Sequence, residues 1–258
     1  MQQIELELAG GGVLTVSLRA SLDAMPAVKE RPLVLVVPGG GYNHVSPREG
    51  DPVALQFAAA GYHTAVLTYN VGEGAQNYQP LRQLNEALAL LRQNAGEWHI
   101  LPDKIAVCGF SAGHLALSAA VLDIPGETAQ QRPNAVILGY PVITAGEFAH
   151  RGSFVRLAGS EDAAAQQVFT LEDKVTSDTP PVFVWHTMED KTVPVENTLL
   201  LLAALRRAGV PCEAHLFEKG AHGTSISTAE VDAADPHRAH WVALCLEWLG
   251  ETFGFKLS

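Results

Sequence analysis

The pentapeptide Gly109-Phe110-Ser111-Ala112-Gly113 stands between an apolar run and a helical pattern. Residues 105–108 (IAVC) predict a buried strand, and residues 111–122 predict a helix. A serine on a sharp strand-to-helix turn has an exposed hydroxyl, and glycines two positions before and after it leave room for that turn. The pattern therefore constrains fold and chemistry together, because it indicates a nucleophilic serine at the carboxyl edge of a parallel sheet.

Short apolar runs alternate with helical patterns along the rest of the chain. Strands are predicted at 33–37, 63–69, 105–108, 135–139, 182–185 and 213–217, and helices at 47–60, 80–95, 111–122, 194–208 and 237–249. This alternation is typical of an α/β fold with a mostly parallel central sheet and helices on both faces. Alternating segments at 4–8 and 13–18 predict an N-terminal antiparallel hairpin. The polar residues 22–31 predict a loop.

The length of 258 residues, 47% of them hydrophobic, fits one α/β domain over 1–258. Residues 144–178 lack a clear periodicity, so we expect a cap or an insertion there, because segments of this length are usually functional or flexible.

The net charge of −11 disfavours nucleic acids and anionic membranes as partners. The N-terminus has no basic start followed by an apolar core, and no apolar run approaches about 18 residues. We therefore expect a cytoplasmic protein without a membrane span. Cys108, Cys212 and Cys245 show no metal-binding spacing, and neither a metal nor another cofactor is implied.

A serine hydroxyl needs a base, and in this structural context an acid and then a histidine follow the serine in the chain. Asp190 follows the strand at 182–185, and His222 follows the strand at 213–217. Each gap holds whole strand–helix units, so the two loops and Ser111 can meet at one sheet edge.

Other polar residues nearby are alternative candidates for the acid and the base. Glu189 adjoins Asp190, and one of the two must point elsewhere. His186 lies within or at the end of a strand, so a packing role is expected. His114 is one turn into the helix after Ser111 and is expected to be structural or to line the pocket.

Negative charge on a reacting carbonyl oxygen requires backbone donors. One is expected from Ala112, next to the nucleophile, and another from the glycine-rich loop at 38–42 (PGGGY). Tyr42, Asn43 and His44 are candidate substrate-binding residues. Tyr69 is a candidate wall residue, with packing as an equal alternative.

Together these residues resemble esterases of the α/β-hydrolase fold, especially the acetyl esterase and hormone-sensitive-lipase-like group, over about 33–249. By this resemblance, Gly40 and Gly41 carry the oxyanion-hole amides. Pro38 stands where that group usually has histidine, and Arg48-Glu49-Gly50 follows, as in bacterial xylan- or sugar-acetyl esterases. The motifs are PGGGY at 38–42, GFSAGH at 109–114, WHTMEDKTVP at 185–194 and GAHG at 220–223.

The resemblance implies a serine carboxylesterase that hydrolyses short-chain acyl esters, including acetylated sugars, through a Ser111–His222–Asp190 triad. Its partner would be a small-molecule ester, and a homodimer is a further expectation. Residues 185–197 also resemble prolyl-oligopeptidase-type enzymes, so a small peptidase or amidase stays an alternative. The third alternative is a non-catalytic, ligand-binding homologue. The presence of all three triad residues disfavours it.

Overall fold

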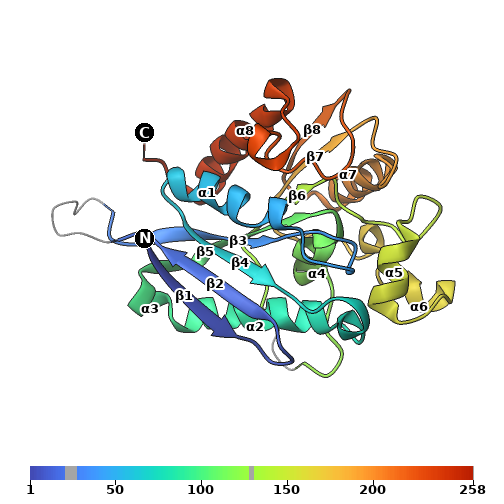
Figure 1. The fold of residues 1–258 in the computed structure, drawn as a ribbon, viewed down its shortest axis with the longest axis horizontal. Helices are drawn as coiled ribbons and strands as arrows, with labels where there is room; N and C mark the ends of the chain where they lie inside the picture. The colour runs from blue at the N-terminus through green and yellow to red at the C-terminus, as the bar shows by residue number, and fades with distance from the viewer. Residues whose placement is uncertain (21–27, 128–130, 258) are drawn as a thin grey trace.

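The computed structural model describes residues 1–20, 28–127 and 131–257. Residues 22–27 of the predicted loop lie outside these ranges. The described residues form an eight-stranded sheet in the order β1-β2-β4-β3-β5-β6-β7-β8 (Figure 1). The strands are β1 (Gln2–Glu7), β2 (Val13–Leu18), β3 (Arg31–Val37), β4 (His63–Thr68), β5 (Ile100–Phe110), β6 (Ala135–Gly139), β7 (Val182–Thr187) and β8 (Cys212–Phe217).

Pairing within the sheet follows the sequence prediction. β1 and β2 form an antiparallel hairpin, and β2 also pairs antiparallel with β4. The other neighbouring strands are parallel, from β4 through β3 and β5 to β8. The predicted α/β fold with a mostly parallel sheet and an N-terminal hairpin is therefore confirmed.

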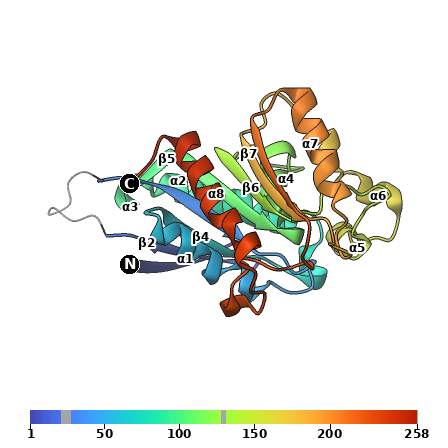
Figure 2. The same cartoon turned by 90° about the horizontal axis from the view of Figure 1, so that it is seen from above.

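Helices cover both faces of the sheet (Figure 2). Side chains of α2, α4 and α7 pack on one face, and those of α1 and α8 pack on the other. The helices are α1 (Asp51–Ala59), α2 (Gln79–Gln93), α3 (Ala95–Trp98), α4 (Leu115–Val121), α5 (Arg151–Ala158), α6 (Ala163–Gln167), α7 (Glu196–Ala208) and α8 (Pro236–Phe253).

Strand β3 is an apolar strand in the interior of the sheet, and the burial of its two faces explains its sequence. Successive side chains point to opposite faces, so Leu33 and Leu35 join the core beneath α2, whereas Val34 and Val36 join the core beneath α1. All seven of its residues are buried. A continuous apolar run is therefore needed here, because both faces are covered.

Residues 144–178 have more regular structure than their pattern predicted. They contain α5 and α6, which lie beside the carboxyl end of the sheet (Figure 1). The two helices have eight and five residues, too few for a repeating apolar stripe to stand out.

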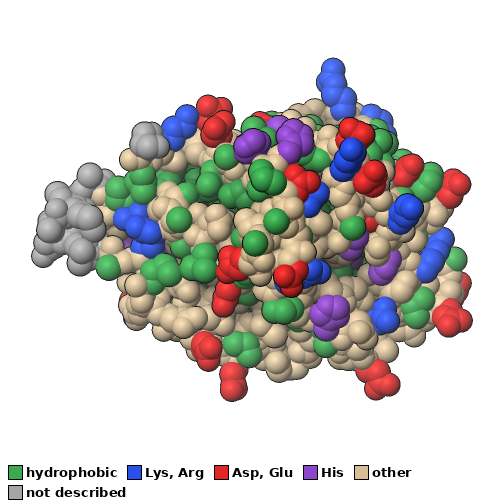
Figure 3. Space-filling view, turned by 45° about the horizontal axis from the view of Figure 1, so that its top comes forward, with side chains coloured by type: hydrophobic (Ala, Val, Ile, Leu, Met, Phe, Trp, Pro, Cys, Tyr) green, Lys and Arg blue, Asp and Glu red, His purple; other side chains and the backbone are tan. Residues whose placement is uncertain are grey.

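On the face in Figure 3, acidic and basic side chains are interspersed. Among the described residues, no helix is both long and apolar enough to cross a membrane.

Candidate active site

Ser111 follows directly after the last residue of β5, at the start of a 3-10 turn, Ser111–His114, that leads into α4. The backbone of Ser111 has a φ of 53°, in the left-handed region that costs energy for a residue with a side chain. A Cβ at Gly109 would overlap the carbonyl oxygen of Gly113, so the turn could not close with a larger residue there. The sequence motif thus folds into the strained turn that it predicted.

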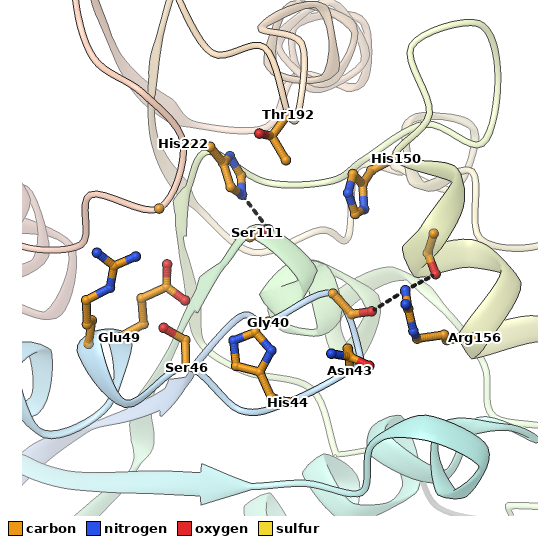
Figure 4. A pocket seen from close by; sticks show the side chains of 14 residues that line it. Gly40, Asn43, His44, Ser46, Glu49, Ser111, His150, Arg156, Thr192 and His222 are labelled. Carbon is orange, nitrogen blue, oxygen red and sulfur yellow. Dashed lines mark hydrogen bonds between the residues drawn. The ribbon is translucent and has the colours of Figure 1, made fainter.

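The three residues expected to form a triad lie in contact. His222 Nε2 is 2.7 Å from Ser111 Oγ, and His222 Nδ1 is 2.6 Å from Asp190 Oδ2 (Figure 4 draws the first contact). An ionised carboxylate can only accept, so Nδ1 carries the proton and donates it to Asp190. Nε2 is then the acceptor for the hydroxyl of Ser111. This arrangement provides a base at the nucleophile and an acid that orients the base.

The carboxylate of Asp190 accepts four hydrogen bonds, and its side chain is inaccessible to solvent. Oδ1 accepts from the amides of Thr192 and Val193, each at 2.9 Å, and Oδ2 accepts from His222 and from His186 Nε2 at 3.2 Å. Burial alone would raise the pKa of Asp190, but these hydrogen bonds and the nearby His222 hold it well below its usual value. Asp190 therefore stays ionised beside His222.

His186 has a second role that the sequence analysis missed. The predicted packing is confirmed, since the residue is fully buried in β7 and its Nδ1 accepts from Thr198 Oγ1 at 2.8 Å. Its opposite nitrogen, Nε2, also faces two acceptors, the carbonyl oxygen of Val193 at 3.0 Å and Asp190 Oδ2 at 3.2 Å. The signal in the sequence was the four-residue spacing to Asp190 across the end of a strand.

The neighbouring candidates are placed away from the reacting serine. Glu189 points to the next loop, where its Oε2 accepts from the amide of Gly220 at 3.3 Å. His114 is fully buried and structural, and its Nδ1 lies 3.2 Å from Tyr42 Oη. Burial lowers the pKa of His114 to about 4, so the ring is neutral at pH 7.

The glycine loop after β3 borders the same pocket as Ser111. At Gly40, φ is 125°, and a Cβ would overlap the carbonyl oxygen of His44, so only glycine fits. Within the described residues, the amides of Gly40 and Gly41 donate no hydrogen bond, whereas the amide of Gly39 donates to Glu49 at 2.9 Å. Gly40, Gly41 and Ala112 therefore stay the predicted oxyanion donors.

The prediction that Tyr42 contacts substrate is wrong. Its side chain is fully buried, and its hydroxyl donates to the carbonyl oxygen of Ala112 at 2.9 Å. Tyr42 supports the turn that holds Ser111 from beneath. Tyr69 is likewise buried and donates to the carbonyl oxygen of Pro38 at 2.7 Å, so packing was the correct alternative for it. An aromatic residue after a run of glycines can face either the core or the pocket, and the sequence pattern is the same in both cases.

A pocket of about 590 Å³ opens over Ser111. Asn43 and His44 line it, as expected of substrate-binding residues. His150 and Arg156 border the opposite side, from the start and the last turn of α5, and Figure 4 shows the ring of His150 directed into the pocket. Neither residue was predicted, because both lie in the segment 144–178, where no periodicity located them.

In the part of the chain that the structure describes, no group of three or more histidine, cysteine, aspartate or glutamate residues could hold a metal ion. The three cysteines are free, with Cys108 and Cys245 buried and Cys212 exposed.

Known proteins resemble this chain in sequence and in fold. A family model described as BD-FAE matches residues 23–136. An acetylxylan esterase of Xylanibacter ruminicola is 30% identical over 203 residues, which cover 76% of this chain and 41% of that protein. The chain spans between 34% and 58% of the length of the curated relatives that it matches.

Two solved structures cover nearly the whole chain. An acetyl ester-xyloside bifunctional hydrolase from Caldicellulosiruptor lactoaceticus is 34% identical, with a TM-score of 0.83 over 95% of this chain and 89% of that one. The α/β-hydrolase enzyme MGS-M1, from a deep-sea metagenome library of the Medee basin, is 35% identical, with a TM-score of 0.81 over 98% of both chains. The chain therefore belongs to the α/β-hydrolase family.

Proposed function

We propose that this protein is a serine carboxylesterase that removes short acyl groups, acetyl above all, from the hydroxyl groups of sugars. The observation that carries the proposal is the unbroken contact from Ser111 through His222 to Asp190, facing an open pocket. A serine activated in this way attacks carbonyl carbons.

In the first half of the reaction, His222 Nε2 takes the hydroxyl proton of Ser111 while Oγ bonds to the ester carbonyl carbon. The carbonyl electron pair moves onto oxygen, where the amides of Gly40, Gly41 and Ala112 are the proposed donors. The intermediate then collapses, and the bond between the carbonyl carbon and the alcohol oxygen breaks. That oxygen takes the proton from His222, so the alcohol leaves and an acyl-serine remains.

In the second half, water gives a proton to His222 while its oxygen bonds to the acyl carbon. The bond from that carbon to Ser111 Oγ breaks, and Oγ recovers the proton from His222. A carboxylic acid is released, and the enzyme returns to its starting state. Throughout, Asp190 stabilises the imidazolium and stays ionised.

The nature of the pocket supports a sugar as the alcohol. Its side chains include an amide, a hydroxyl, two imidazoles and a guanidinium, from Asn43, Ser46, His44, His150 and Arg156. These groups hydrogen-bond to hydroxyls, and the described residues that line the pocket include no aliphatic or aromatic hydrocarbon side chain to hold a long acyl chain. Relatives described as an acetylxylan esterase and an acetyl ester-xyloside hydrolase support the same substrate class.

A substrate panel tests the proposal. Purified protein is given p-nitrophenyl acetate, butyrate and octanoate, an acetylated xylose and an aminoacyl p-nitroanilide. We expect the highest kcat/KM on acetyl esters and no turnover of the anilide. Faster cleavage of the anilide would favour the peptidase alternative instead. The cytoplasmic location and the homodimer stay predictions.

A further inference from the structure

Glu49 is a buried carboxylate beside Ser111 to which no catalytic role has been given so far. It ends a short 3-10 turn, Pro47–Glu49, is 3% exposed, and borders the pocket (Figure 4). Burying a charge is costly unless the group is paired or fully hydrogen-bonded. In the described part of the chain, hydrogen bonds rather than an ion pair hold this carboxylate.

These hydrogen bonds connect three loops at the carboxyl edge of the sheet. Glu49 Oε2 accepts from the amide of Gly39 at 2.9 Å, in the loop after β3. Glu49 Oε1 accepts from Tyr140 Oη at 2.5 Å, in the loop after β6. Tyr140 Oη in turn accepts from the amide of Ser225 at 2.9 Å, in the loop after β8, three residues beyond His222.

Further contacts make this connection rigid. Ser225 Oγ donates to the carbonyl oxygen of Arg48 at 2.5 Å, so the loop after β8 is tied directly to the turn that carries Glu49. The ring of Tyr140 packs edge-on against His222, with centroids 4.9 Å apart. Burial, followed by the charge of Glu49, raises the pKa of Tyr140 well above its usual value. The hydroxyl of Tyr140 therefore stays protonated and can donate its hydrogen bond to Glu49.

We propose that Glu49 is a positioning residue that fixes the glycine loop and the loop of the base relative to each other. Gly39 immediately precedes the proposed oxyanion donors Gly40 and Gly41, so anchoring its amide sets their direction. Through Tyr140 the same carboxylate sets the place of the loop that holds His222. This inference rests on the proposed esterase function, because the hydrogen bonds are taken to position the oxyanion donors and the base for the transition state of ester cleavage.

A carboxylate suits this place because both of its oxygens face a donor. In Glu49→Gln, one oxygen becomes an NH₂ group. Facing Gly39, this group meets another donor; facing Tyr140, it can donate to Oη, but the tyrosine proton then loses its acceptor. Size is kept, and in either orientation one buried donor is left without its acceptor. In Tyr140→Phe, the Glu49–Gly39 bond remains, but the connection to Ser225 is lost. Each variant therefore weakens the connection between the two loops.

The experiment compares kcat, KM and the inhibition constant of phenylboronic acid in wild type and variants. Phenylboronic acid forms a tetrahedral adduct with the serine, so its binding follows the geometry of the oxyanion site. We expect E49Q to lower kcat on p-nitrophenyl acetate by at least about tenfold, with KM within about twofold. The inhibition constant should rise in proportion. Y140F should show the same pattern, and the double variant should lose less than the product of the two single losses.

Glu86 provides a matched control, because its carboxylate also accepts from a backbone amide, that of Ala9 at 3.0 Å, but near the N-terminal hairpin. E86Q should keep wild-type kcat and inhibition. Wild-type kcat in E49Q, or lowered kcat without weaker inhibition, would overturn the inference. If E49Q does not fold, Y140F decides by the same two criteria. Inactive wild-type protein would instead contradict the proposed esterase function.

Discussion

His186 Nε2 lies 3.2 Å from Asp190 Oδ2, the same carboxylate oxygen that accepts the hydrogen bond from His222. Both side chains are inaccessible to solvent. Asp190 therefore has histidines on two sides, one that faces the nucleophile and one that is part of the core. The inner histidine, held by Thr198 at 2.8 Å, fixes the carboxylate against which the outer one is aligned.

Replacing His186 by leucine removes this support. Asp190, Val193 and Thr198 each lose a buried partner, so we expect the free energy of unfolding at pH 7 to fall by about 1–3 kcal/mol. We expect kcat/KM on p-nitrophenyl acetate to fall by about tenfold, because the base is less well aligned. Urea denaturation and steady-state kinetics measure the two effects. His215→Leu, on the neighbouring strand and partly exposed, is the control, and equal activity in both variants would contradict the role of His186.

The same pair predicts an effect in acid. The lowered pKa of Asp190 in the folded protein contributes stability above the unfolded value near 4, and this contribution is lost as pH falls through the folded pKa. Without His186 the pKa of Asp190 is lowered less. The loss begins near the unfolded pKa in both proteins, so the stability of His186→Leu should fall by a smaller total and level off at a higher pH than that of wild type, in denaturation series from about pH 5 downward.

His114 predicts a pH dependence of its own. Burial lowers its pKa to about 4, whereas an unfolded histidine titrates near about 6.5. Between these values the unfolded chain binds more protons, so stability is complete above the unfolded pKa and falls as pH drops toward 4. His114→Leu should remove up to about 3 kcal/mol of the stability difference between pH 7 and pH 4. The exposed His240→Leu serves as the control, and an unchanged slope in His114→Leu would contradict the burial effect.

His150 predicts a difference between substrates. Burial, with His222 and Arg156 nearby, lowers the pKa of His150, so the ring is neutral at pH 7. Ser153 Oγ lies 2.8 Å from Nδ1, so Nε2 is the ring nitrogen left to bind a ligand. His150→Ala should raise KM for an acetylated xylose by about three- to tenfold and leave KM for p-nitrophenyl acetate within about twofold. Equal changes on both substrates would show that the ring does not bind the sugar.

The sequence was sufficient to predict the strands, the turn at Ser111 and the order of acid and base. These features depend on short-range patterns: a continuous apolar run, a glycine pair around a serine, and polar residues directly after strands. The contacts among loops were not predictable in the same way. Glu49 stood out only as part of a family motif. Its partner Tyr140 is 91 residues away, and Ser225, which donates to Tyr140, is 176 residues away.

The sequence also did not predict whether a side chain points into the core or into the pocket. Tyr42 follows three glycines next to the pocket, yet its side chain turns inward to Ala112. His150 and Arg156 reach the pocket because α5 packs beside the glycine loop, where Arg156 Nη1 lies 3.4 Å from the carbonyl oxygen of Gly41. Neither residue belongs to a motif. Such positions are determined by tertiary packing, which periodicity in a single sequence does not encode.

Labelling of Ser111 by a fluorophosphonate tests the central claim most directly. Wild-type protein is treated with the probe, digested, and analysed by mass spectrometry, with Ser111→Ala as the control. The proposed mechanism predicts one adduct, on Ser111, together with loss of p-nitrophenyl acetate hydrolysis in step with labelling, and neither label nor activity in the alanine variant. Hydrolysis at a near wild-type rate by Ser111→Ala, or an unlabelled Ser111 in wild-type protein, would contradict the assignment of the nucleophile.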